Sequence, residues 1–271
     1  MYRRLIPAGT LIVASALSLA SQLGAYPGGT PRFVTNAAPY CATCHSSASS
    51  EQLRDLPPEA VANMLAQKRH YSAITAGEEN YKKLEPPDRE KLLDAVKAMD
   101  ANCRVDLAVS STRVKRQAPL TVTVTTRGGA GPVVGVMLTD TDLRFQASPI
   151  QSEGFLLAAA PQVTGPDGKP QTKFLDGRAP ELSKNINYVN IQDVKSDPDS
   201  NQYPECKVVY ALKAPAEAGE YTISAAFLYG TEKASAAGRV EGFGGRVMPA
   251  GGQGGGSGRV QFAKLVKVTV K

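Results

Sequence analysis

Hydrophobic and polar residues alternate along much of the chain from residue 104 to its end. Val105, Leu107 and Val109 form one set with a two-residue period. Side chains of a β-strand point to opposite faces in turn, so this period predicts strands with one buried face. Similar runs cover residues 120–124, 133–138, 143–147, 155–159, 186–191, 208–212, 221–228 and 260–270. Turn-forming Gly, Pro and Asp residues lie between them, so we predict an antiparallel β-sandwich over residues 104–271.

Two stretches refine the expected sandwich. Ala214-Pro215, followed by Gly-Glu-Tyr-Thr-Ile at 219–223, resembles the paired late strands of immunoglobulin-like and fibronectin-type domains. This resemblance implies an Ig-like architecture but no function. Residues 242–258 hold nine glycines. Because no Gly-Lys-Ser/Thr ends this stretch, we interpret it as a Gly-rich loop between two strands and not as a phosphate-binding loop.

Hydrophobic positions recur at helical spacing twice before residue 104. The first predicted helix starts near Asp55, with prolines at its beginning, and runs to about His70. A turn near Gly77 follows. Pro86-Pro87 opens the second helix, which ends near Asn102. Residues 26–103 are therefore expected to form a small helical domain, and the whole chain an α+β protein of two domains.

The first 25 residues have the pattern of a secretory signal peptide. Arg3 and Arg4 precede an apolar run at residues 11–20, and small residues at Ala20 and Ala25 offer cleavage positions. An uncleaved N-terminal anchor is the alternative, although the run is barely long enough to span a bilayer. We therefore expect an exported protein, periplasmic or at the cell surface, with no other membrane span.

The stretch Cys41-Ala42-Thr43-Cys44-His45 carries the most specific chemistry in the sequence. Cys-x-x-Cys-His is the attachment pattern of c-type haem, in which two thiols bond covalently to the porphyrin edge and the histidine binds the iron. A thioredoxin-like redox pair is the alternative. That pair would follow a buried strand, whereas residues 26–40 are rich in Pro and Gly. The pattern therefore predicts one covalent haem c.

Residues 26–103 resemble the haem domain of single-haem c-type cytochromes. The resemblance rests on Cys41, Cys44 and His45 and on a closing helix that contains Pro-Asp-Arg-Glu-Lys-Leu-Leu at residues 87–93. It implies that the two cysteines attach the haem and that His45 is the proximal iron ligand. It also implies electron transfer, and it fits export because c-type haem is attached outside the cytoplasm.

The second axial position of the iron decides between an electron carrier and a catalyst. His70, the only other histidine, is the first candidate for the sixth ligand. Met64 is the alternative, since thioether ligation is common in this family. The remaining alternatives are Met99, another donor and an open site. His70 could equally be a helix-terminal residue, and the two methionines could be apolar core residues.

The charge distribution bears on the class of binding partner, and the two cysteines outside the motif bear on a disulfide. The net charge is +6, but residues 26–103 carry nine basic against ten acidic residues, so the excess is not gathered around the motif. No cluster of basic and aromatic residues suggests nucleic acid. In an oxidising compartment, Cys103 and Cys206 are expected to form a disulfide.

The leading hypothesis is an exported electron carrier, with the sandwich as a docking or assembly module. We expect a redox partner protein, and a second copy of the chain is the other partner considered. A haem enzyme or haem-based ligand sensor, with an open or displaceable sixth site, is the alternative. The sequence has no Ser-His-Asp set, which favours a carrier over an enzyme.

Overall fold

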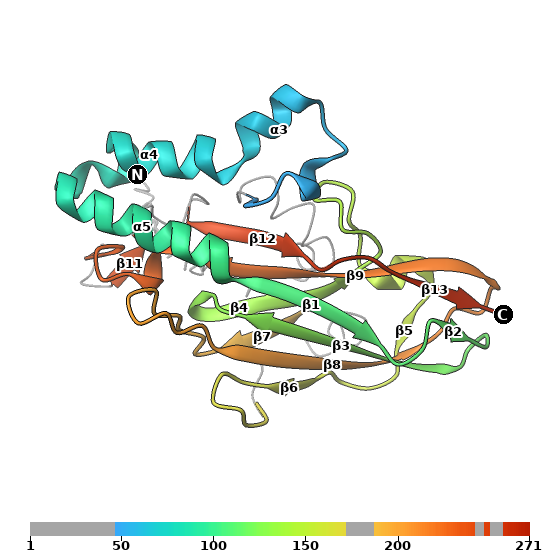
Figure 1. Ribbon diagram of the computed structural model, residues 1–271. Helices are drawn as coiled ribbons and strands as arrows, with labels where there is room; N and C mark the ends of the chain where they lie inside the picture. The colour runs from blue at the N-terminus through green and yellow to red at the C-terminus, as the bar shows by residue number, and fades with distance from the viewer. Residues whose placement is uncertain (1–46, 172–186, 242–246, 250–256) are drawn as a thin grey trace, which may run out of the picture.

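The computed structural model describes residues 47–171, 187–241, 247–249 and 257–271, and Figure 1 shows its elements. Three sequence predictions lie outside these residues: the signal peptide of residues 1–25, the motif of Cys41, Cys44 and His45, and most of the Gly-rich loop of residues 242–258. Within the described part of the chain, no helix is long and apolar enough to cross a membrane.

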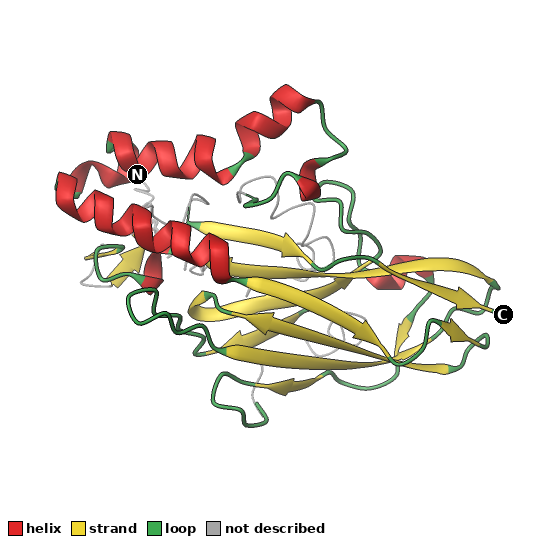
Figure 2. Cartoon of the chain, viewed as in Figure 1, coloured by secondary structure: helices red, strands yellow, loops and turns green. Residues whose placement is uncertain are grey.

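Two sheets face each other across one apolar core, and all their strand pairs are antiparallel, as the alternating pattern predicted, except the parallel pair of β2 and β13 (Figure 2). The first sheet has the order β1-β3-β8-β5, with β6 also paired to β8, and the second has the order β2-β13-β9-β4-β7, with β12 also paired to β9. The strands of the first sheet are β1 (Arg104–Val109), β3 (Pro119–Arg127), β5 (Leu156–Leu157), β6 (Gln162–Thr164) and β8 (Glu205–Lys213). Those of the second are β2 (Arg113–Val114), β4 (Ala130–Thr139), β7 (Val189–Gln192), β9 (Gly219–Gly230), β12 (Gly258–Phe262) and β13 (Val266–Val270). A separate hairpin joins β10 (Arg239–Glu241) to β11 (Val247–Pro249).

Burial follows the sequence alternation most clearly at the centre of the first sheet. In β3, Leu120, Val122 and Val124 are buried, and in β8 every second residue from Cys206 to Leu212 is buried. The threonines that alternate with these buried residues are less buried: Thr121 is exposed, and Thr123 and Thr125 are partly exposed. This is the arrangement of a sheet with one solvated face. β9 differs, because every residue from Ile223 to Tyr229 is buried. Both faces of the second sheet are therefore covered at β9.

The helical part differs from the prediction in its first half. The expected helix up to His70 is interrupted at Leu65, which is extended (φ −67°, ψ 147°). The resulting pieces are η1 (Glu51–Leu53), α3 (Pro58–Met64), the π-helical turn η2 (Gln67–Tyr71), α4 (Ser72–Ala76) and η3 (Glu79–Lys83). Gly77 ends α4 in the left-handed region (φ 66°), the conformation that glycine adopts most easily. The second predicted helix is confirmed as α5 (Pro86–Asn102).

The helices lie together over one end of the sandwich, opposite the C-terminus (Figure 1). α5 runs directly into β1, and Met99 and Cys103 are part of the sandwich core. From the other side, the loop that follows β9 and contains η5 (Glu232–Ala234) packs against α5. This contact is so close that a Cβ on Gly238 would lie 2.9 Å from Leu92 Cδ1 of α5, and within the loop itself it would lie 2.1 Å from the carbonyl oxygen of Glu232. The helical part is therefore packed on the sandwich as well as on itself.

Three predicted strand runs are wrong in part. Residues 143–147 form a turn, and only Leu156–Leu157 of the run 155–159 is a strand. The run 260–270 is divided between β12 and β13 by residues 263–265. An apolar run therefore implies neither continuous strand pairing nor burial, and Leu156 in the second run is 49% exposed.

The predicted Cys103–Cys206 disulfide is contradicted, because both thiols are free and buried. Cys206 lies on β8 opposite Thr126 of β3, and Thr126 lies opposite Val105 of β1. Strand β3 therefore separates the two cysteines, and strands two positions apart are about 9–10 Å from one another. A disulfide requires Cα atoms within about 7 Å. The Cys103 sulfur instead accepts a hydrogen bond from Gly129 N at 3.1 Å.

Candidate haem site and the buried cluster beside it

The first described residue after the haem motif is held firmly at the junction of helices and sandwich. Ser47, two positions after His45, is buried and forms a parallel bridge with Leu65. Its carbonyl oxygen accepts a hydrogen bond from Ala66 N at 3.1 Å. Ser47 is thus fixed at the end of α3, where the described part of the chain begins.

A second set of contacts ties the same segment to the sandwich. The side-chain amide of Gln52 lies 2.6 Å from Ser47 Oγ. With its nitrogen toward Val260 O (3.1 Å) and its oxygen toward Phe262 N (3.0 Å), this amide continues the hydrogen bonding of β12. Gln52 O also accepts from Arg144 N at 3.0 Å. The chain leaving the motif is thus fixed to both parts of the protein.

α3 presents an apolar side that the described residues do not fully cover. Val61, Met64 and Leu65 are each only partly buried, and α3 contains no fully buried residue. Partly exposed apolar side chains of this kind leave a surface that a further apolar group can cover. Met64 belongs to this surface, at the end of the helix next to the anchored Ser47.

His70 lies at the centre of a buried polar cluster, with 2% of its surface exposed. Its Nε2 is 2.8 Å from Glu232 Oε1 and 2.8 Å from Tyr81 Oη. Tyr81 Oη also donates a hydrogen bond to Glu232 Oε1. On the other side of the ring, Nδ1 is 2.8 Å from Arg259 Nη2. Both ring nitrogens of His70 therefore contact protein groups.

These contacts determine which nitrogen of His70 carries the proton. A guanidinium has donors only, so Nδ1 must accept the hydrogen bond from Arg259 and carries no proton. Nε2 then carries the proton and donates to the carboxylate of Glu232. Burial lowers the pKa of His70, and this effect outweighs the hydrogen bond to Glu232, which would raise the pKa. The imidazole is therefore neutral, and neither nitrogen offers a free lone pair to iron in this arrangement.

The outer half of the cluster joins β12 to α5. Arg259 is 1% exposed, and its Nε and Nη2 lie 2.7 and 3.0 Å from the two carboxylate oxygens of Asp100. Tyr71 Oη donates to Asp100 Oδ2 at 2.6 Å. Burial alone would lower the pKa of Arg259, but Asp100 outweighs it and the pKa is raised. Arg259 therefore stays charged and makes a two-pronged ion pair with Asp100.

The other methionine considered for the iron is enclosed. Met99 on α5 has no exposed surface and belongs to the core of the sandwich. Its thioether is surrounded by apolar side chains, which is the ordinary role of a core methionine. Of the candidates for the sixth ligand, Met64 is therefore the one whose surroundings leave it accessible.

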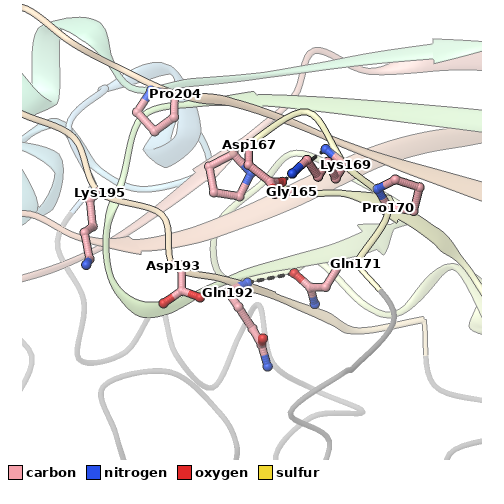
Figure 3. A pocket seen from close by; sticks show the side chains of 10 residues that line it. Gly165, Asp167, Lys169, Pro170, Gln171, Gln192, Asp193, Lys195 and Pro204 are labelled. Atoms are coloured by element: carbon pink, nitrogen blue, oxygen red, sulfur yellow. Dashed lines mark hydrogen bonds between the residues drawn. The ribbon is translucent and has the colours of Figure 1, made fainter.

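A separate cavity lies at the edge of the sandwich, between the turn after β6 and the end of β7 (Figure 3). Gln171 joins the two sides, since its amide accepts from Gln192 N at 2.9 Å and donates to Asn190 O at 2.8 Å. Both lysines and aspartates line it: Asp167, Lys169, Asp193 and Lys195. No three His, Cys, Asp or Glu side chains gather to hold a metal ion anywhere in the described ranges. This mixed charge selects no particular ligand.

Sequence reasoning singled out His70 but missed its partners. Glu232 and Arg259 lie 162 and 189 residues further along the chain, after a strand and at the end of a Gly-rich stretch. Neither belongs to a motif. Arg259 directly precedes the predicted strand run of residues 260–270, and nothing in the sequence marks it as buried.

No protein-family model matches the chain, and no curated protein matches it in sequence. The pilus backbone protein RrgB of Streptococcus pneumoniae is similar in structure at 12% identity and a TM-score of 0.31, over 48% of this chain and 53% of that one. The C-terminal domain of the Streptococcus agalactiae AgI/II polypeptide BspA is similar at 10% identity and a TM-score of 0.32, over 62% and 50% of the two chains. This chain thus spans about half the length of these structures. TM-scores this low carry no argument about function.

Proposed function

We propose that this protein is an exported, single-haem c-type cytochrome that transfers electrons. The observation that carries the proposal is the Cys41-x-x-Cys44-His45 motif, which enters the described structure through the buried, doubly anchored Ser47. A haem c supplies an iron that can gain and lose one electron reversibly. Cys41 and Cys44 attach it, and His45 is its proximal ligand.

Met64 replaces His70 as the favoured sixth ligand in this proposal. Met64 ends the helix that lies beside Ser47 and is only partly buried, whereas both nitrogens of His70 are engaged by Glu232 and Arg259. Thioether ligation raises the reduction potential relative to two histidines. In the proposed cytochrome, His70 then stabilises the packing of the helices on the sandwich and does not bind iron.

The sandwich is proposed as the module that docks the cytochrome to a redox partner or to further copies. One haem cannot carry electrons over a long path by itself, so a partner must approach the haem. The anchoring of Ser47 to β12 through Gln52 supports this division, because the described part of the chain begins beside the sandwich. Export to the periplasm or the cell surface follows from the N-terminal signal pattern.

Expression with a c-type maturation system tests the proposal. The expected product retains haem after denaturation and organic extraction, with an intact mass increased by one haem. Its visible spectrum is expected to be low-spin in both oxidation states. A high-spin spectrum with rapid carbon monoxide binding to the reduced form would favour the haem enzyme or sensor. A mass without haem would overturn both.

A further inference from the structure

The outer face of the first sheet, formed by β1, β3 and β8 side by side, has uncharged side chains at its centre (Figure 1). These central residues are small and are exposed or partly exposed: Ala108, Thr121, Thr123, Val209 and Ala211. At the margin, Leu156 of β5 faces outward beside Lys213 and is 49% exposed, the most of any large apolar side chain in the described ranges. A centre without charge inside a charged border is typical of a protein interface.

The strand register arranges the charged border at one end of this face in two neighbouring rows. Across β1, β3 and β8, in that order, one row consists of Arg104, Arg127 and Glu205 and the other of Asp106, Thr125 and Lys207. The charged residues on β1 and β8 are exposed, whereas the Arg127 guanidinium lies over the ring of Tyr203, 5.7 Å from its centroid. Each row therefore has opposite charges on the two sides of β3, and the order of the signs is reversed between the rows.

This arrangement is self-complementary about a twofold axis that runs along β3. A half-turn about an axis parallel to β3 lays β1 of a second copy over β8 of the first and keeps each row level. Asp106 of each copy then faces Lys207 of the other, and Arg104 faces Glu205 in the same way. A twofold interface requires this reciprocity. If β1 and β8 carried the same sign in either row, like charges would meet.

The face is large enough for a reversible dimer. β3 has nine residues and the sheet is four strands wide, so at about 3.4 Å per residue and 4.8 Å per strand the face covers on the order of 550 Å². Two copies would bury about 1,100 Å² in total, just above the roughly 1,000 Å² of a specific interface. Small side chains lose little rotamer freedom when two sheets pack face to face. We therefore expect a weak dimer that depends on concentration.

We propose that the outer face of the first sheet binds the same face of a second copy of this chain. Asp106 pairs with Lys207 across this twofold interface, Arg104 pairs with Glu205, and Thr123 lies at the axis, where it meets its own counterpart. The inference goes beyond the proposed electron transfer. It rests on the strand register and on exposed charges, and not on haem binding.

Charge reversal at one of these pairs tests the proposal, with sedimentation equilibrium of the exported protein as the measurement. Asp106→Lys places two lysines opposite each other at both symmetric contacts, and Lys207→Asp does the same with two aspartates. Each variant is therefore expected to raise the dimer Kd about tenfold or more. An equimolar mixture of the two variants should return the Kd to within about threefold of the unmodified value. In the mixed dimer, the introduced lysine faces the introduced aspartate, and the native Asp106 faces the native Lys207.

Lys267→Asp is the matched control, because Lys267 is exposed on β13 of the second sheet and the net charge changes by the same amount. It should leave the dimer Kd unchanged, whereas Thr123→Lys should abolish the dimer by placing two charges at the axis. A protein that stays monomeric at about 0.1 mM would overturn the proposal, since a weak specific interface is partly occupied there. Failure of the mixture to recover, or equal weakening in Lys267→Asp, would overturn it too. A dimeric protein without covalent haem would instead overturn only the proposed function.

Discussion

Arg259 Nη2 lies 2.8 Å from His70 Nδ1, although 189 residues separate them in the sequence. Because the guanidinium can only donate, this one contact requires a neutral imidazole protonated at Nε2. It also joins η2 of the helical part to strand β12 of the sandwich. The predictions below follow from this contact and its neighbours.

Stability should fall as the pH drops below about 6.5, the ordinary pKa of histidine. Burial lowers the pKa of His70 in the folded protein, so in this window the unfolded chain binds a proton that the folded one does not. The loss should begin near pH 6.5, grow down to the lowered pKa, and then level off. Urea unfolding from pH 8 to 5 measures it. The slope should largely disappear in His70→Gln, and an unchanged slope there would assign it to other groups.

Removing the buried cation should be costly. Arg259→Met leaves the carboxylate of Asp100 without its two-pronged partner, and breaking a buried pair in this way typically costs about 3–5 kcal/mol. Chemical denaturation gives the free energy of unfolding. The control is Arg104→Met, whose partner Asp106 lies 3.9 Å away with both side chains largely exposed, and which should change stability by less than about 0.5 kcal/mol.

The close packing around residue 238 should leave room for no side chain larger than that of glycine. In Gly238→Ala the new Cβ would lie 2.1 Å from the carbonyl oxygen of Glu232 in the same loop and 2.9 Å from Leu92 Cδ1 of α5, so the loop must change its conformation and its packing on α5. We expect a loss of about 1–3 kcal/mol, as for other overpacked sites. Gly219→Ala is the matched control, because its nearest neighbouring atom is 3.4 Å from the added Cβ. Equal melting temperatures for the two variants would contradict the close packing of this loop.

The two remaining cysteines should stay reduced and unreactive. Burial raises the pKa of both the Cys103 and the Cys206 thiols to about 12, so little of the reactive thiolate forms at neutral pH. Folded protein should therefore resist alkylation, and unfolded protein should take up two labels. A disulfide-linked peptide pair in the exported protein would contradict the strand order that separates them.

Replacing Met64 tests the revised iron ligation. In Met64→Ala the holoprotein should become high-spin or bind water, with haem still covalently attached through Cys41 and Cys44. Met99→Leu should stay low-spin, because Met99 is enclosed in the sandwich core. The visible spectra of the oxidised forms separate these outcomes. A low-spin Met64→Ala would return the choice to His70 or another donor.

Local patterns allowed much of the fold to be predicted. The alternation in β3 and β8 and the proline-led start of α5 are properties of short segments, so they could be recognised without the rest of the chain. The break at Leu65 could not. It depends on pairing with Ser47, a contact between segments that helical periodicity does not register.

The candidate site was predictable only where its chemistry is encoded in adjacent residues. Cys41, Cys44 and His45 form such a motif, whereas the surroundings of His70 depend on Glu232 and Arg259. A lone histidine near a helix end looks the same in sequence whether it binds iron, faces solvent or joins a buried cluster. The predicted disulfide failed for a related reason, since counting cysteines does not reveal the intervening strand β3.

The distance in sequence between His70 and its partners has a consequence for biosynthesis. Chains are made from the N-terminus, and early domains usually fold before later ones are complete. Here the imidazole cannot be buried in its final surroundings until residues 232 and 259 have been synthesised. Residues 41–45 are therefore made well before the cluster around His70 can close. In the proposed cytochrome, that interval would give the attachment machinery access to Cys41 and Cys44.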